Sequence, residues 1–487
     1  MGIRLNVWFL IIVLVLGSCG SGSNFDTNLG SSEETTQNAN GSTTTDNIQV
    51  EENTTSSNTG TTPVEDNTQS ENTPIDEGTS ESLNPIFREF NVGFGGSGSF
   101  GFESVDGDVV WLSAIDLLIN DDIEKNSYYT TIKSFNANRF DILQQKLKGS
   151  KYIVFWITKS WEEVWFSASQ IQEAMDEGYI PVFNYWYFGD GLSSGLPSEE
   201  KTAIYYEHNI KVAKFLKQLK GTKFVVMEPE FNKKVVVDVV ANQHTFASIM
   251  GHAIDTLRVN LDDETFFSLC MMDTGSTSVN SSYESCGYSN CALGDRKEWG
   301  KPYYVYKDLL DKLDFISFNQ LVGQFSRDDS NPGSYHSPNP KASTNDEVGI
   351  DLLAARIENL TKFLKEKYAK PVFMPYVAIA TATWNDSNNN GSIELSEIDE
   401  EGWESEANRF YTDLMNIKED LLQSGLFGFA VMSLFDNPRN DYGGYQYLMN
   451  NEYHLGIIKT SAIDEEDKYR IGDIEFKKDI VDIVFEK

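Results

Sequence analysis

The chain has 487 residues, and its 74 acidic against 39 basic residues give it a formal net charge of −35. A chain of this length suits one large domain with added segments rather than a minimal compact domain. The negative charge argues against nucleic acids and anionic lipid surfaces as partners, because both are bound through basic patches.

The N-terminal residues are typical of an export signal. Arg4 precedes an apolar run over 7–16, which is too short to span a bilayer as a mature helix. The run leads into LGSC at 16–19, which resembles the lipobox of bacterial lipoproteins. This resemblance implies that residues 1–18 are removed and that Cys19 carries a lipid. The protein would then be exported and anchored at the outer membrane or cell surface by that lipid alone. An ordinary secretory signal followed by an incidental cysteine is the alternative.

Residues 19–84 have the composition of a disordered linker. They are rich in Ser, Thr, Asn, Gly and acidic residues and contain neither Lys nor Arg. Such a segment buries too little apolar surface to offset the entropy that is lost on ordering. We therefore predict a flexible tether that separates the folded part, residues 85–487, from a membrane. The alternative is that this segment is a linker without a function of its own.

Eight short apolar runs in the folded part predict eight strands. They cover 89–95, 152–158, 179–188, 223–230, 265–273, 313–321, 371–380 and 427–435. Near-continuous apolar character over about four to eight residues is typical of parallel strands that are covered on both faces.

Helical segments separate several of these runs. Apolar residues recur every three or four positions over 167–178, 207–221, 350–368 and 404–425, and all but the third of these segments end at a glycine. Strands that alternate with helices predict an α/β fold, a (β/α)8 barrel with loop insertions, rather than an open doubly wound sheet. The glycine-rich stretch 93–101 superficially resembles a dinucleotide-binding loop. No helical pattern follows it, so we predict a flexible loop at the barrel mouth.

The carboxyl ends of the strands are where a barrel of this type carries its functional residues. Aromatic rings, amides and carboxylates gather at these positions in the sequence. Aromatic rings stack on the apolar faces of sugar rings, whereas amides and carboxylates bond to sugar hydroxyl groups. We therefore predict that a polysaccharide or oligosaccharide is bound by Asn184, Trp186, Tyr187, Asp190, Asn232 and Asn319.

Glu228 and Glu230 stand at the end of the fourth run. Strand alternation would put both side chains on one face, roughly 6–7 Å apart, and Pro229 marks the strand end because it cannot donate to the ladder. Two like charges this close raise the pKa of one of them, which suits a proton donor. We predict Glu230 as the first candidate for a general acid and Glu228 as the second. The alternative is a structural role in ion pairs with Lys233, Lys234 or Arg439.

The order of these parts resembles the clan A glycoside hydrolases, a superfamily of barrel enzymes. The resemblance implies an acid/base glutamate at the end of the fourth strand, although the asparagine that usually precedes it is absent here. It also implies a nucleophilic glutamate on the seventh strand, where this sequence has no acidic residue before Asp386. Either Asp190, Asp273 or Asp436 then acts as a base on water, or the two glutamates share the roles. A non-catalytic glycan-binding lipoprotein on the same fold is the third possibility.

The cysteines suggest one disulfide. Cys286 and Cys291 lie close together in a stretch rich in Gly, Ser and Asn, and in an exported protein we predict that they close a small loop. A metal site is the weaker alternative, because no His or further Cys is nearby. Cys270 lies in an apolar run and is predicted to be buried.

Residues 386–397, DSNNNGSIELSE, match the calcium-binding loop of EF-hand type in full. Oxygen-bearing groups at alternate positions converge on one ion in such loops, and a glycine allows the sharp turn. We predict a structural Ca²⁺ site of modest affinity, because few of its ligands are acidic. A solvated Asn-rich loop is the alternative. The predicted ligands are Asp386, Asn388, Asn390, Ser392 and Glu397.

The calcium prediction is tested by titration of the purified protein with Ca²⁺ in a calorimeter. We expect a dissociation constant on the order of 0.1–1 mM, as in extracellular modules, and a melting temperature that rises with Ca²⁺. Asp386→Ala should abolish both effects because it removes a ligand. Asn389→Ala, inside the same loop but at a position that supplies no ligand, should leave them unchanged. Equal binding by all three proteins would contradict the site.

Overall fold

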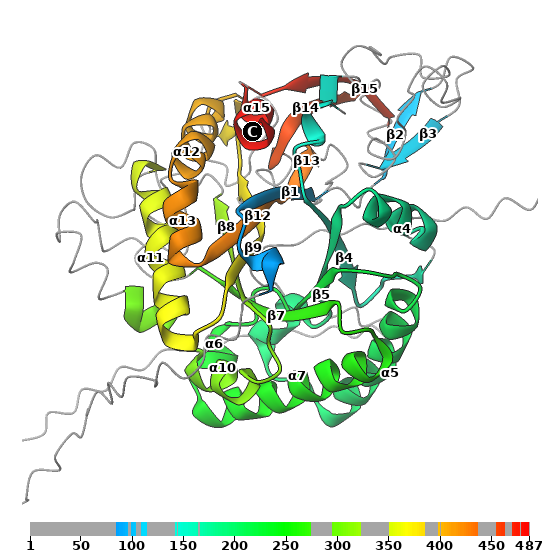
Figure 1. The fold of residues 1–487 in the computed structure, drawn as a ribbon, viewed down its shortest axis with the longest axis vertical. Coiled ribbons are helices and arrows are strands. Elements are labelled where there is room, and N and C mark those ends of the chain that lie inside the picture. The colour runs from blue at the N-terminus through cyan, green and yellow to red at the C-terminus, as the bar shows by residue number, and fades with distance from the viewer. Residues whose placement is uncertain are drawn as a thin grey trace, which may run out of the picture. The chain divides into compact units, whose positions relative to one another are not determined.

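Eight parallel strands close into a barrel in the computed structural model of the chain (Figure 1). The structure describes residues 84–95, 99–103, 109–113, 142–143, 145–163, 166–273, 295–322, 350–384, 398–399, 401–436, 454–462, 470–477 and 479–486. The predicted signal 1–18 and the predicted tether, apart from its last residue, lie outside these ranges.

The ring of strands follows the order of the sequence. Each strand pairs in parallel with the next, and the last pairs with the first. The strands are β1 (Asn91–Gly95), β4 (Tyr152–Thr158), β5 (Ile180–Trp186), β6 (Lys223–Met227), β7 (Thr265–Met272), β8 (Ile316–Val322), β9 (Val372–Ile379) and β12 (Leu426–Val431). All eight predicted runs are strands of this ring, so the (β/α)8 barrel is confirmed.

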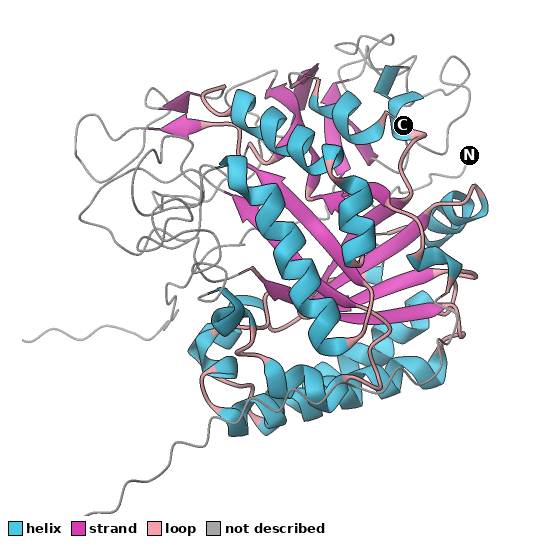
Figure 2. Cartoon of the chain, turned by 60° about the vertical axis from the view of Figure 1, so that its left-hand side comes forward, coloured by secondary structure: helices cyan, strands magenta, loops and turns pink. Residues whose placement is uncertain are grey.

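Helices surround the strands, as Figure 2 shows. They are α4 (Ala168–Asp176), α5 (Glu199–Leu216), α6 (Lys234–Val237), α7 (Val240–Asn260), α10 (Tyr303–Leu309), α11 (Ile350–Tyr368), α12 (Glu404–Asn416), α13 (Lys418–Ser424) and α15 (Ile480–Phe485). The side chains of Ser167 and Ser198 cap α4 and α5 by accepting bonds from backbone N–H groups of the first turn. In the described part of the chain, no helix is long and apolar enough to cross a membrane.

Two small sheets accompany the barrel. One has five strands in the order β13 (Ser433–Phe435), β14 (Gly456–Ala462), β15 (Arg470–Phe476), β2 (Ser99–Glu103) and β3 (Val109–Ser113). The other pairs β10 (Thr383–Trp384) with β11 (Ile398–Asp399). The prediction of a loop over 93–101 is therefore wrong at both ends, because residues 93–95 belong to β1 and residues 99–101 to β2, which pairs antiparallel with β3.

Aromatic side chains fill the amino-terminal end of the barrel. The 3₁₀ turn η1 (Pro85–Phe87) places the ring of Phe87 4.9 Å from that of Phe427 and 5.5 Å from that of Phe266, between ring centroids. Both partners stand at the second residue of their strands. This end is closed by apolar packing, so polar side chains that face the barrel interior collect at the opposite, carboxyl end.

Candidate active site

The turn after β6 has an unusual backbone. The strand ends at Met227, and both Glu228 and Glu230 adopt positive φ angles, 36° and 65°, which non-glycine residues rarely do. The N–H of Glu228 donates to the carbonyl of Tyr185 on β5, and that of Glu230 to the carbonyl of Cys270 on β7. The extended strand therefore ends before the two glutamates, so their side chains do not follow its alternation. The two side chains contact different partners.

Glu230 lies at the mouth of the barrel, where its side chain is almost fully buried. Its Oε1 accepts hydrogen bonds from the hydroxyl of Tyr376, at 3.0 Å, and from Nδ2 of Asn319, at 3.3 Å. Its Oε2 accepts from the ammonium of Lys233 at 3.1 Å. All these partners are donors, so the ionised carboxylate, rather than the proton donor that we predicted, matches the surroundings of Glu230.

Lys233 connects Glu230 to a second carboxylate. Its Nζ lies 3.3 Å from Oδ1 of Asp190, which belongs to the 3₁₀ turn η4 (Gly189–Ser194) that follows β5. Burial lowers the pKa of Lys233, but the charges of Glu230 and Asp190 more than offset this and raise it above its usual value. The ammonium group is therefore charged, and it brings two of the predicted carboxylates within reach of one cation.

Glu228 is fully buried on the other side of the same turn. Its Oε1 accepts hydrogen bonds from the backbone N–H groups of Tyr187 and Phe188, at 3.0 and 3.1 Å. Burial raises the pKa of Glu228 to about 8, although backbone amide groups lower it in part. The predicted rise in pKa is thus present at one glutamate, but burial and not the neighbouring carboxylate causes it. Backbone N–H groups engage its carboxyl oxygens, so we do not assign this carboxyl group a contact with a substrate.

Two half-buried tryptophans stand on the inner face of β4 and β5. The rings of Trp156 and Trp186 lie 6.1 Å apart, nearly perpendicular, and the ring of Tyr376 lies 5.1 Å from Trp156. Trp186 was predicted as a binding residue, and the ion pair of Glu230 with Lys233 is the one that we gave as the alternative, structural role of the glutamates. Trp156, Tyr376 and the contact of Lys233 with Asp190 were not predicted. The alternation of inward and outward positions along β4 and β9 is the signal that would have marked the two aromatic residues.

Polar atoms without protein partners also face the mouth. Asn184 stands in register with Trp156 and Val226 on the inner face, is fully buried, and neither amide atom has a hydrogen-bond partner. Nε1 of Trp186 and Oδ1 of Asn319 are also buried atoms without a hydrogen-bond partner. Buried polar groups are nearly always bonded, so this set favours a site for a ligand rich in hydroxyl groups.

Tyr187 and Asn232, two predicted binding residues, take structural positions instead. Tyr187 points outward from β5, and its ring packs 4.9 Å from that of Tyr205 on α5. The amide of Asn232 bonds to both the N–H and the carbonyl of Met272, at 2.7 and 2.9 Å. The ring of Tyr187 therefore packs on the helix side of the sheet, and both polar atoms of the Asn232 amide are engaged by the backbone of Met272.

Asp273, a predicted base, belongs to a buried ion cluster. Its two oxygens accept hydrogen bonds from Arg356 on α11, at 2.8 and 2.9 Å, and one also accepts from Nε1 of Trp299, at 2.9 Å. Asp295 pairs with the same guanidinium group at 2.5 Å. Both oxygens of Asp273 are engaged in these contacts, which hold α11 against the end of β7. We therefore do not assign Asp273 a catalytic role.

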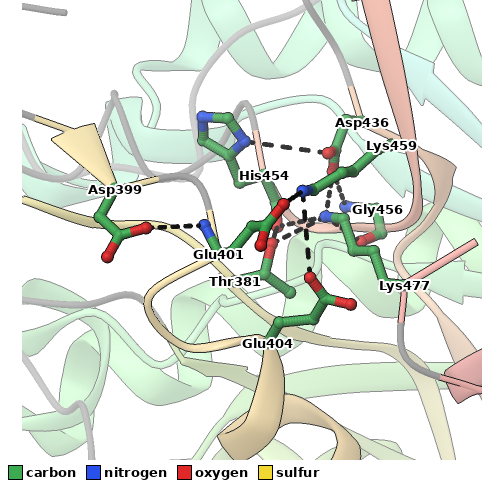
Figure 3. A network of polar contacts seen from close by, with 9 residues as sticks. All are labelled: Thr381, Asp399, Glu401, Glu404, Asp436, His454, Gly456, Lys459 and Lys477. Atoms are coloured by element: carbon green, nitrogen blue, oxygen red, sulfur yellow. Dashed lines mark hydrogen bonds and ion pairs between the residues drawn. The ribbon is translucent and has the colours of Figure 1, made fainter. Parts of the chain in front are cut away.

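Asp436, another predicted base, binds a buried lysine near the C-terminus, as Figure 3 shows. Its Oδ1 lies 2.6 Å from Nζ of Lys477 and accepts the N–H of Gly456 at 3.0 Å. Lys477 also donates to Oγ1 of Thr381, at 2.8 Å, and to the carbonyl of Gly456. This network joins the ends of β9, β13 and β15, and we no longer assign Asp436 a catalytic role either.

Several predicted residues lie outside the described ranges. They are the lipidation site Cys19, the pair Cys286 and Cys291, the calcium ligands Asp386, Asn388, Asn390, Ser392 and Glu397, and Arg439. Cys270 is buried with a free thiol, as predicted. Within the described ranges, no group of three or more His, Cys, Asp or Glu side chains is placed to hold a metal ion.

Comparisons with known proteins give only distant similarities. No protein-family model and no curated protein matches the chain. Among solved structures it is similar to the β-glycosidase from Pyrococcus horikoshii, at 12% identity over 82% of this chain and 94% of that chain, with a TM-score of 0.46. A family 1 β-glucosidase from Thermotoga maritima matches at 12% identity over 82% and 97% of the two chains, with a TM-score of 0.45. The assignment of the barrel therefore depends on the strand pairing of this chain itself.

The buried carboxyl group of Glu228 predicts a pH-dependent stability. With a pKa of about 8 against an ordinary value of 4.5, the folded protein keeps a proton that the unfolded chain releases between these pH values. The free energy of unfolding should therefore fall as the pH rises from about 5 to about 8, by at most about 1.4 kcal/mol per pH unit for this group.

Urea denaturation of wild type and Glu228→Gln at several pH values measures this effect. We expect the difference in stability to move in favour of the variant as the pH rises, because glutamine does not titrate. Asp311→Asn, which removes an exposed carboxylate from the same domain, should follow the wild-type curve. Parallel curves for wild type and Glu228→Gln would contradict the raised pKa.

Proposed function

We propose that the barrel is a glycoside hydrolase-like enzyme that cleaves a polysaccharide or oligosaccharide with the carboxyl pair Glu230 and Asp190. The observation that carries this proposal is that Lys233 lies 3.1 Å from one of these carboxylates and 3.3 Å from the other at the barrel mouth. Cleavage of a glycosidic bond usually takes two such groups, one protonated and one ionised. Trp156 and Trp186 supply apolar surface for a sugar ring, and Asn184 supplies an amide for its hydroxyl groups.

The surroundings of the two carboxyl groups suggest their roles. Glu230 receives only donors, so it acts as the carboxylate that attacks the anomeric carbon or activates a water molecule. Asp190 is the more exposed of the two, with side-chain exposures of 20% and 5%, so it exchanges protons with solvent more readily. The hydrolysis that we propose starts once Asp190 has taken up a proton from solvent. Asp190 then protonates the leaving oxygen and recovers a proton from water.

A non-catalytic glycan-binding protein is the second candidate. It is favoured by β9, the seventh strand of the ring, which carries no acidic residue between Val372 and Ile379. It is also favoured by the ammonium of Lys233. If neither carboxylate took up a proton, both would stay paired with this group and neither would act as an acid. The aromatic and amide groups of the mouth suit either function.

Release of reducing sugar from a panel of polysaccharides tests the proposal. We expect wild type to cleave at least one of them, and Glu230→Gln and Asp190→Asn to lower kcat by about 10²–10⁴-fold, the range for loss of an acid or base. Both changes are isosteric, and glycan binding should persist. Asp311→Asn, the matched change at an exposed site, should keep full activity.

The outcomes separate the two candidates. Binding without release by any of these proteins would favour the glycan-binding protein. Full activity of Glu230→Gln and Asp190→Asn would contradict the carboxyl pair, and the absence of both binding and release would contradict a glycan site altogether.

We also propose where the domain acts. A lipid on Cys19 would anchor it on the outside of a bacterial membrane, and residues 20–84 would give it reach toward the polysaccharide. Ca²⁺ at 386–397 would hold the loop that follows β10. The lipobox resemblance, the composition of the linker and the full match of the calcium motif support these proposals.

A further inference from the structure

Glu228 is a buried carboxyl group that the proposed chemistry does not use. It stands at a strained backbone position, with φ at 36°, and its side chain has no exposed surface. A buried carboxyl group destabilises a protein unless its surroundings compensate for the loss of water. Its electrostatic neighbours are Tyr185, Tyr187 and Tyr205, and burial raises the pKa of each of these, so they are neutral. None of these neighbours therefore carries a charge that would stabilise a buried carboxyl group at position 228.

The hydrogen-bond partners of the Glu228 side chain belong to one turn. The N–H of Glu228 donates to the carbonyl of Tyr185, at 2.8 Å, which extends the pairing of β6 with β5 by one step. Its carboxyl oxygens accept the N–H groups of Tyr187 and Phe188 at 3.0–3.2 Å, where β5 turns into η4. The side chain therefore fixes the backbone between the last residue of β5 and the first residue of η4.

The same turn carries two groups of the candidate active site. Trp186 is the last residue of β5, and its ring lies against Gly189, where an added Cβ atom would stand 3.0 Å from Cε2 of the tryptophan. Gly189 has a φ of 52°, so a side chain there would strain the backbone as well. Asp190 follows directly and pairs with Lys233, which pairs with Glu230. An unbroken set of contacts thus leads from Glu228 to the carboxyl pair.

We infer that Glu228 is a positioning residue: its carboxyl group holds the turn 187–190 in the conformation that sets Asp190 on Lys233 and the ring of Trp186 beside the carboxyl pair. The catalytic effect of Glu228 rests on the proposed function, whereas its role in holding the turn does not. Removal of the carboxyl group frees two backbone N–H groups and lets the turn move. Asp190 then leaves Lys233, and Glu230 loses its partner carboxyl group although neither residue has changed.

The first test needs no substrate. Lys233 is acetylated with an N-hydroxysuccinimide ester, and the rate is followed by mass spectrometry of its peptide in the full-length protein. Loss of the Asp190 carboxylate should expose the amine of Lys233 and lower its pKa. Each unit by which this pKa falls raises the fraction of uncharged, reactive amine about tenfold. We expect Asp190→Asn to speed acetylation by roughly tenfold, Glu228→Ala to approach that rate, and Glu228→Gln, which keeps one acceptor oxygen, to lie between.

A matched control separates positioning from general loss of stability. Asp314, at the opposite end of the barrel, also accepts a backbone N–H, that of Phe267 at 2.7 Å. Asp314→Asn should lower the melting temperature without changing the acetylation of Lys233. If Glu228→Ala does not fold, Glu228→Gln decides. Acetylation of Lys233 at the wild-type rate in the folded Glu228 variants, or in Asp190→Asn, would overturn the inference.

The second test applies once a cleaved glycan is known. Glu228→Ala should lower kcat by about 10–100-fold with a smaller change in KM, as expected when a catalytic group is displaced by about 1 Å. Glu228→Gln should restore part of that loss. Absence of hydrolysis by wild type would contradict the proposed function while leaving the acetylation result intact. Hydrolysis that is unaffected in both Glu228 variants would overturn the positioning role alone.

Discussion

The contact of one ammonium group with two carboxylates is the interaction on which the mouth of this barrel depends. Charges removed from water destabilise a protein unless their remaining hydrogen-bonding positions are filled. Lys233 meets that condition by binding Glu230 and Asp190 together, and Tyr376 and Asn319 fill the second oxygen of Glu230. The group draws on the turns that follow β5 and β6 and on side chains of β8 and β9, so the ring of strands brings its members together from four places in the chain.

This arrangement has an energetic cost that the rest of the domain offsets. Glu228 and Glu230 each adopt a backbone conformation that costs on the order of 1–3 kcal/mol for a non-glycine residue. Glycine or asparagine at these positions would relieve that strain. Strained residues of this kind gather at functional sites, where the surrounding structure holds them. Here the neighbouring strands do so, because the N–H groups of both glutamates continue the ladder toward β5 and β7.

The sequence was sufficient to predict the barrel, since continuous apolar runs are a direct consequence of burial on both faces. The site was harder to predict, because side chains at the end of a strand point either into the mouth or toward the helices. Trp186 points inward and Tyr187 outward, and strict alternation along β5 would have separated them. Alternation failed at Glu228 and Glu230, because it holds only while the backbone is extended. Asp273 and Asp436 were misplaced because their partners, Arg356 and Lys477, lie far away in the sequence.

The pairing of β1 with β12 has a consequence for how the chain acquires its structure. Residues 91–95 hydrogen-bond with a strand that begins at Leu426, so the ring stays open until nearly all of the polypeptide is available. Lys477, still later, ties down the ends of β9 and β13. Long-range contacts of this kind make folding slow. A polypeptide that emerges gradually, from a ribosome or through a membrane pore, therefore remains without its closed core until its final segment has arrived.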